Sequence, residues 1–94
     1  MSEPVALVVE DDGVVAAMVR DWLREDGWEV RLAPTADEAL DLADRGRPDL
    51  VLLDLVLPGG FDGAALAAHL RLRPGWDRVP MVVMSSRNDA GPAG

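Results

Sequence analysis

The stretch that decides the fold of this chain is Pro48-Asp49-Leu50-Val51-Leu52-Leu53-Asp54-Leu55-Val56-Leu57-Pro58-Gly59. Residues 50–53 carry no polar side chain, which is typical of a strand buried on both faces of a parallel sheet. Pro58 and Gly59 then favour a turn. Ligands of open α/β sheets bind outside the carboxyl ends of the strands, so Asp54 is a candidate functional residue.

The rest of the chain alternates strand and helix patterns. We expect further strands at residues 5–9, 28–32 and 80–84, and helices at about 13–26, 36–45 and 63–72. The strand at 28–32 alternates apolar and charged residues, as expected at a sheet edge. This βαβαβαβ order predicts a parallel sheet with right-handed crossovers and helices on both faces.

Local signals support the expected helices. Asp12 is a plausible N-cap of the first helix, and Gly27 suits the position just after its end. Thr35 and Glu38 form a capping box for the second helix. The helical spacing of five apolar residues predicts the buried stripe of the first helix: Val15, Met18, Val19, Trp22 and Leu23.

Composition limits the possible functions. The chain has 94 residues, enough for one small domain, and a formal net charge of -8. That charge argues against nucleic acid or an anionic membrane as a direct partner. There is no cysteine, no apolar run of membrane-spanning length, and no basic segment at the amino terminus. We therefore expect a cytoplasmic protein without disulfides.

Acidic and hydroxyl groups follow three of the predicted strands: Glu10 and Asp11, Asp54, and Ser85 with Ser86. Carboxylates placed together repel one another unless a cation lies between them, and hard oxygen ligands suit Mg²⁺. A carboxylate can also attack phosphorus and form an acyl phosphate. In the alternative interpretation, Glu10 and Asp11 only cap a helix, Asp54 only ends a strand, and the serines are turn residues.

Three pieces of sequence, in order and at the expected spacing, resemble the receiver domains of bacterial response regulators. They are residues 7–12, 48–59 and 80–87, and the resemblance covers residues 5–87. It implies a flavodoxin-like, doubly wound parallel sheet with strand order 2-1-3-4, in which the usual fifth strand is missing. It also implies a receiver domain at residues 1–87, incomplete, followed by a flexible tail at 88–94.

The resemblance assigns roles to individual residues. Asp54 would accept a phosphoryl group from the phosphohistidine of a sensor histidine kinase or a phosphotransfer protein. Glu10, Asp11, Asp54 and the backbone carbonyl of Val56 would hold Mg²⁺. The hydroxyl of Ser85 and the backbone N–H of Ser86 would contact the phosphoryl group. Such a domain catalyses its own phosphorylation and turns over no metabolite.

The chain also departs from the family pattern. The turn after Asp54 carries one extra residue, and the family's Lys and fifth strand are absent; all nine basic residues are Arg. Arg87 is a weak candidate to replace that Lys. Without a fifth strand, residues 81–84 would form an exposed apolar edge that could pair with a second copy.

Two alternative functions remain open at this stage. One is a degenerate receiver that acts as a protein-interaction or dimerisation module without phosphorylation. The other is a Mg²⁺-dependent phosphatase or mutase with an aspartyl nucleophile. Such enzymes usually carry a second Asp two residues after the nucleophile, and Val56 occupies that position here.

Overall fold

The structure, a computed structural model, describes residues 3–55 and 62–84. These residues form four strands and three helices in strict alternation: β1 (Val5–Val9), α1 (Gly13–Glu25), β2 (Glu29–Ala33), α2 (Ala36–Arg45), β3 (Leu50–Asp54), α3 (Gly63–Arg71) and β4 (Met81–Met84). The order of elements predicted from the sequence is confirmed. β2 begins one residue later than predicted, and β4 begins after Pro80.

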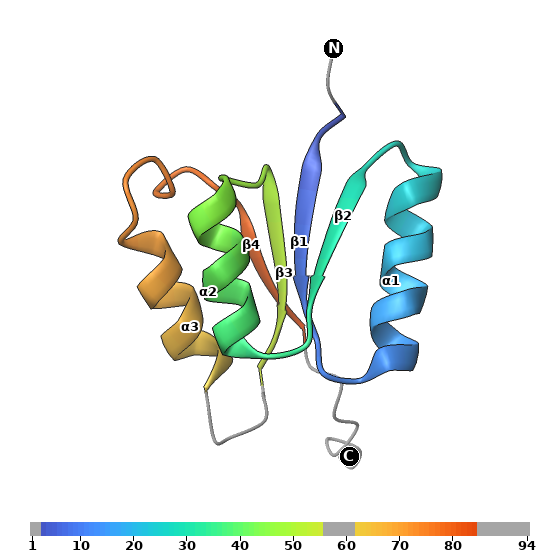
Figure 1. Ribbon diagram of the computed structural model, residues 1–94, viewed down its shortest axis with the longest axis horizontal. Helices are drawn as coiled ribbons and strands as arrows, with labels where there is room; N and C mark the ends of the chain where they lie inside the picture. The colour runs from blue at the N-terminus through green and yellow to red at the C-terminus, as the bar shows by residue number, and fades with distance from the viewer. Residues whose placement is uncertain (1–2, 56–61, 85–94) are drawn as a thin grey trace, which may run out of the picture.

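The strands form one parallel sheet in the order β2-β1-β3-β4, which is the flavodoxin-like arrangement predicted from the sequence (Figure 1). In its register Val9 lies beside Leu53, so β1 and β3 end at nearly the same level. Asp54 pairs with Met84 at the end of β4. The carboxyl ends of these three strands therefore meet at one edge of the sheet.

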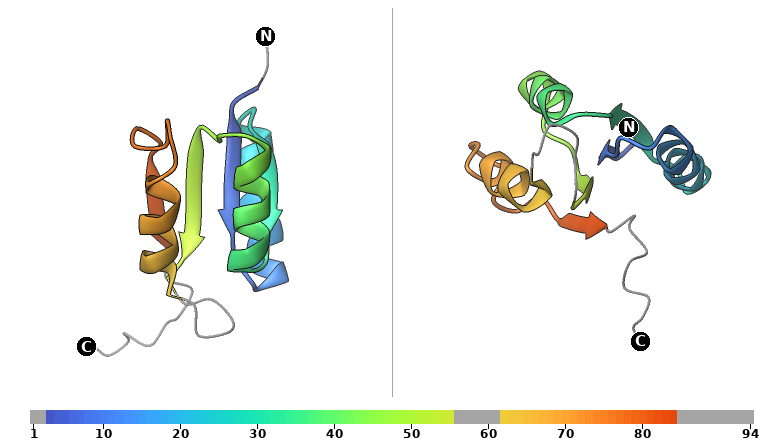
Figure 2. Two further views of the ribbon diagram at one scale, coloured as in Figure 1. Left: turned by 60° about the vertical axis from the view of Figure 1, so that its left-hand side comes forward. Right: turned by 90° about the horizontal axis from the view of Figure 1, so that it is seen from below.

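Two helices cover one face of the sheet and one helix covers the other (Figure 2). α2 and α3 lie over the same face, and the largest group of buried side chains fills the space between them and the strands. That group includes Leu7 and Val9 of β1, Leu53 of β3, and Leu66 and Leu70 of α3. Strand residues alternate between the two faces, so both faces of β1 and β3 need apolar side chains.

α1 begins and ends as the sequence predicts, but its buried stripe is narrower than predicted. The Asp12 side chain accepts hydrogen bonds from the helix amino terminus, and Gly27 has a φ of 91°. Met18 and Trp22 are 46% and 63% exposed, so the prediction that they are buried is wrong. The reason is geometric: among the described elements α1 contacts β1 and β2 but neither β3 nor β4.

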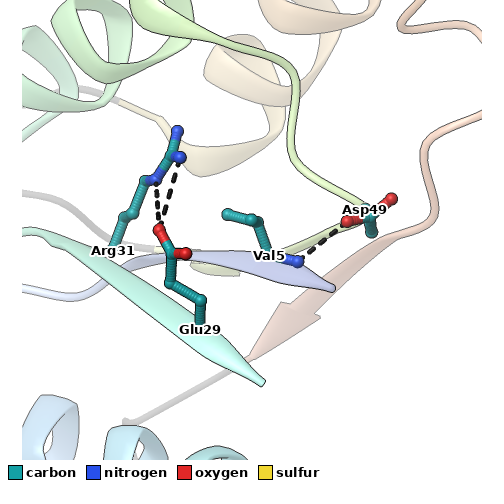
Figure 3. Close-up of polar contacts among 4 residues, drawn as sticks. All are labelled: Val5, Glu29, Arg31 and Asp49. Carbon is teal, nitrogen blue, oxygen red and sulfur yellow. Dashed lines mark hydrogen bonds and ion pairs between the residues drawn. The ribbon is translucent and has the colours of Figure 1, made fainter. Parts of the chain in front are cut away.

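Polar contacts hold the other helices and the loops between strands. Thr35 Oγ1 accepts the backbone N–H of Glu38 at 3.1 Å, as expected of an N-cap. Asp49 Oδ2 accepts the N–H of Val5 at 2.8 Å, which ties the start of β3 to β1 (Figure 3). None of the described helices is long and apolar enough to cross a membrane.

Candidate functional site

Three carboxyl groups meet where β1 and β3 end. Glu10 and Asp11 directly follow β1, and Asp54 is the last residue of β3. One carboxylate oxygen of each residue lies within 4.8 Å of the others. The structure thus brings together the three acidic side chains that the sequence pointed to, because adjacent parallel strands deliver their carboxyl ends to the same edge.

The three side chains differ in exposure. Glu10 and Asp54 are 2% and 1% exposed, and they are the buried charged residues of the described chain, whereas Asp11 is exposed. Glu10 Oε2 accepts the N–H of Asp12 at 3.1 Å. Glu10 Oε1 is buried and has no hydrogen-bond partner among the described residues. A buried oxygen without a partner is costly, and it is the kind of group that a bound cation satisfies.

Burial makes the carboxyl group of Glu10 a weaker acid than an exposed glutamate. The pKa of its carboxyl group rises from 4.5 to about 7, first because burial disfavours the charged form. The nearby negative charges of Asp54 and Asp11 raise the pKa further, and the hydrogen bond from the Asp12 backbone partly offsets these effects. Near neutral pH the site therefore alternates between a protonated and an ionised Glu10.

Gly63, the first residue of α3, lies very close to the backbone of Asp54 and Leu55. The N–H of Gly63 donates to the carbonyl of Leu55 at 2.9 Å. A Cβ atom at position 63 would overlap the carbonyl oxygen of Asp54 and lie 2.9 Å from Cα of Leu55. Asp62 then caps α3 by accepting the N–H of Ala64 at 2.9 Å. Sequence reasoning missed this role of Gly63, although the Asp-Gly pair after the strand was its signal.

Several residues predicted for the site lie outside the described part of the chain. They are Val56, Ser85 and Ser86, together with Arg87 and the tail at 88–94. Met84, the last described residue before Ser85, pairs with Asp54. Its carbonyl also accepts the N–H of Leu55 at 2.9 Å. The described end of β4 thus lies directly beside the acidic cluster.

The donor set fits a small, hard divalent cation. Three carboxyl groups within reach of one another provide oxygen ligands, and Glu10 Oε1 accepts no hydrogen bond from residues 3–55 or 62–84. Asp11 is exposed, which leaves room for the water ligands that Mg²⁺ retains. Zn²⁺ sites usually use Cys and His, and the chain has no Cys and one His.

Comparison with known proteins gives a consistent result. The family model for the response regulator receiver domain matches residues 6–93. The phosphate regulon transcriptional regulatory protein PhoB of Rhizobium meliloti is 35% identical over 86 residues, covering 92% of this chain and 37% of PhoB. The transcriptional regulatory protein AruR of Pseudomonas aeruginosa is 38% identical over 91 residues, covering 92% of this chain and 36% of AruR.

Solved structures agree with the sequence matches. The non-phosphorylated HemR receiver domain of Leptospira biflexa superposes with a TM-score of 0.80 at 32% identity, covering 90% of this chain and 66% of that one. This chain thus spans about a third of the length of these curated relatives and just under two thirds of the HemR chain. The acidic cluster, the strand order and these matches lead to one conclusion: the chain belongs to the response regulator receiver domain family.

Proposed function

We propose that this chain accepts a phosphoryl group on Asp54 and acts as the receiving element of a phosphorelay. The observation that carries the proposal is the cluster of Glu10, Asp11 and Asp54 at the carboxyl edge of the sheet. The Asp54 carboxylate is fixed at a strand end and buried among other carboxyl groups. Receiver domains act as signalling phosphoacceptors, so this reaction modifies the protein and turns over no metabolite.

Each described acidic residue has a distinct part in the proposal. A carboxylate oxygen of Asp54 attacks the phosphorus of the donor, and the bond from phosphorus to the donor group breaks as the acyl phosphate forms. The ionised forms of Glu10 and Asp11 serve as cation ligands and do not react. Gly63 lets the start of α3 pass close to the backbone of Asp54, where a larger residue would collide with its carbonyl oxygen.

Receiver domains generally bind Mg²⁺ at an acidic pocket, and Glu10, Asp11 and Asp54 would hold it here, with the Val56 carbonyl as a proposed fourth ligand. When bound, Mg²⁺ supplies positive charge that offsets the charge of the carboxylates and of the phosphoryl group. Protonation of Glu10 competes with this role, because a neutral carboxyl group is a poor cation ligand. We assign to Ser85 the hydroxyl and to Ser86 the backbone N–H that contact the transferred group.

The proposed partner is a sensor histidine kinase or a phosphotransfer protein, met in the cytoplasm. The net charge of -8 makes direct nucleic-acid binding by this chain unfavourable. The proposal also divides the chain into a receiver unit at residues 1–87 and a tail at residues 88–94. It further includes self-association of the chain through β4.

The test is intact mass spectrometry after incubation with acetyl phosphate, with and without Mg²⁺. We expect one added phosphoryl group that requires Mg²⁺ and is lost in Asp54→Asn. Asp41→Asn is the matched control, because Asp41 is an exposed residue of α2 and should leave the adduct intact. A folded chain that forms no adduct would support the alternative of a degenerate receiver that acts only through protein contacts.

A further inference from the structure

The charged side chains of the described residues are separated along the direction of the strands. All three helices begin at the edge of the sheet where the strands end, and they run back to the opposite edge (Figure 1). At the carboxyl edge lies an acidic rim, which we define as the five exposed residues Asp11, Asp12, Asp37, Glu38 and Asp62. With the buried Glu10 and Asp54, seven carboxyl groups lie at this end of the molecule.

The arginines have the opposite distribution. Those in the last turns of helices or in the connections that lead to β3 and β4 are Arg24, Arg45, Arg47, Arg71, Arg73 and Arg78. Arg20 and Arg31 lie within α1 and β2, so no described arginine lies at the carboxyl edge. The remaining sequence adds no net side-chain charge, since residues 56–61 carry none and 85–94 carry one Arg and one Asp. The end that holds Asp54 is therefore strongly negative.

Helix capping explains where some of these carboxylates lie but not how many there are. Asp12 and Asp62 accept the N–H groups of Val14 and Ala64, each at 2.9 Å. Asn or Ser would cap about as well without a charge. Three helix amino termini and one bound divalent cation together supply about 3.5 positive charges. Against seven carboxyl groups this leaves about 2.5 negative charges even when Glu10 is protonated.

A second observation points to a positively charged ligand at this edge. Glu10 is 2% exposed, and its Oε1 has no hydrogen-bond partner among the described residues. Carboxylate oxygens of Glu10, Asp11 and Asp54 lie within 4.8 Å of one another. A buried oxygen in such surroundings is costly unless positive charge reaches it. The edge is thus suited to cationic groups that come from outside the described chain.

We propose that the partner presents its phosphohistidine on a basic surface, whose Arg or Lys side chains pair with the acidic rim. The inference rests on the proposed phosphoacceptor function and adds to it the chemistry of the donor. A phosphoryl group is itself negative, so the rim opposes its approach unless its carrier is basic. Complementary charge on the carrier speeds association, and like charge excludes wrong donors.

The transfer itself needs no further reactant. A carboxylate oxygen of Asp54 forms a bond to phosphorus as the bond from phosphorus to the imidazole nitrogen breaks. The electron pair of the broken bond stays on that nitrogen, and the other ring nitrogen already carries a proton, so a neutral histidine leaves. The basic groups of the partner undergo no bond change. They lower the electrostatic cost of bringing a phosphoryl group to an acidic edge.

Two synthetic phosphohistidine peptides that differ only in the flanking residues, arginines in one and glutamates in the other, test the proposal. Transfer to the chain is followed by intact mass against time, at constant Mg²⁺ and at ionic strengths of roughly 20 and 500 mM. We expect the arginine peptide to react at least about tenfold faster at the lower ionic strength. Screening at the higher one should reduce the difference to about twofold.

A double variant of the rim tests the role of this chain. Asp12→Asn with Asp62→Asn removes two rim charges and keeps both caps, so the advantage of the arginine peptide should fall at least about threefold. Asp41→Asn with Asp77→Asn is the matched control, because it makes the same change in net charge. Asp41 lies within α2 and Asp77 precedes β4, both exposed, so this variant should keep the full advantage.

Equal rates for the two peptides at low ionic strength would overturn the proposal. An advantage that persists at high ionic strength, or that survives in the Asp12→Asn, Asp62→Asn variant, would overturn it as well, as would labelling by acetyl phosphate but by neither peptide. Labelling by acetyl phosphate reports the proposed function by itself. A chain that no donor labels would remove that function, so the two failures can be told apart.

Discussion

Replacing Glu10 by Gln should stabilise the metal-free protein above neutral pH. The Glu10 pKa rises from 4.5 to about 7 on folding, so between these values the folded state binds a proton that the unfolded chain releases. The free energy of unfolding therefore falls as pH rises through this window. The rise in pKa corresponds to at most about 3 kcal/mol of unfolding free energy at pH 8. Gln keeps the shape of the side chain and removes the ionisation.

Urea unfolding at intervals from pH 4.5 to pH 8, with a chelator present, measures this effect. The difference between Glu10→Gln and wild type removes the pH dependence that the two proteins share. We expect a difference near zero at pH 4.5 that grows to as much as about 3 kcal/mol at pH 8. Glu25→Gln removes a charge from an exposed residue of α1 and is the control for net charge.

With Mg²⁺ added, wild type should become more stable than Glu10→Gln at pH 8. Cation binding to the folded state stabilises it by mass action, and this gain requires an ionised Glu10. Wild type should gain more from Mg²⁺ at pH 8 than at pH 5.5, and Glu10→Gln should gain less than wild type at pH 8. Parallel pH curves for wild type and variant, or a loss of stability in Glu10→Gln at pH 8 without metal, would refute the reasoning.

Three further substitutions test other parts of the structure, each by urea unfolding. Gly63→Ala forces a methyl group against the Asp54 carbonyl, so it should cost about 1–3 kcal/mol and also slow phosphoryl acceptance measured by intact mass. Asp12→Ala removes the N-cap of α1 and should cost about 1 kcal/mol, with Asp12→Asn close to wild type. Arg71→Ala frees the carbonyls of Trp76 and Val79 and should cost about 1–2 kcal/mol, of which Arg71→Lys should recover only part, because it lacks the planar guanidinium.

The parts of the fold that follow from local rules were predictable from the sequence. The sequence distinguished the central strand β3 from the edge strand β2. Residues 50–53 are all apolar, as expected of a strand buried on two faces, whereas residues 28–32 alternate, as expected of a strand buried on one face. The acids that end β1 and β3 were predicted to meet because parallel strands share an edge. Asp12 and Thr35 are caps, as expected.

The features that the sequence did not reveal depend on which elements pack against each helix. Helical spacing placed Met18 and Trp22 with the buried residues, but α1 reaches only β1 and β2 among the described elements. Alanines of α3 also fit an apolar face, yet Ala64, Ala65 and Ala68 are exposed. Periodicity identifies an apolar flank, whereas its burial depends on a neighbour far away in the sequence.

The acidic cluster is better explained by binding than by helix capping. Among the described side chains, that of Asp12 accepts the hydrogen bonds from the amino terminus of α1, so Glu10 and Asp11 are not needed to start that helix. Burial instead makes the ionised form of Glu10 unfavourable, and one of its oxygens has no hydrogen-bond partner in the described part of the chain. If position 10 had only a structural role, Gln would be more favourable there than Glu. A cation held by Glu10, Asp11 and Asp54 would offset this cost, as the proposed phosphoacceptor function requires.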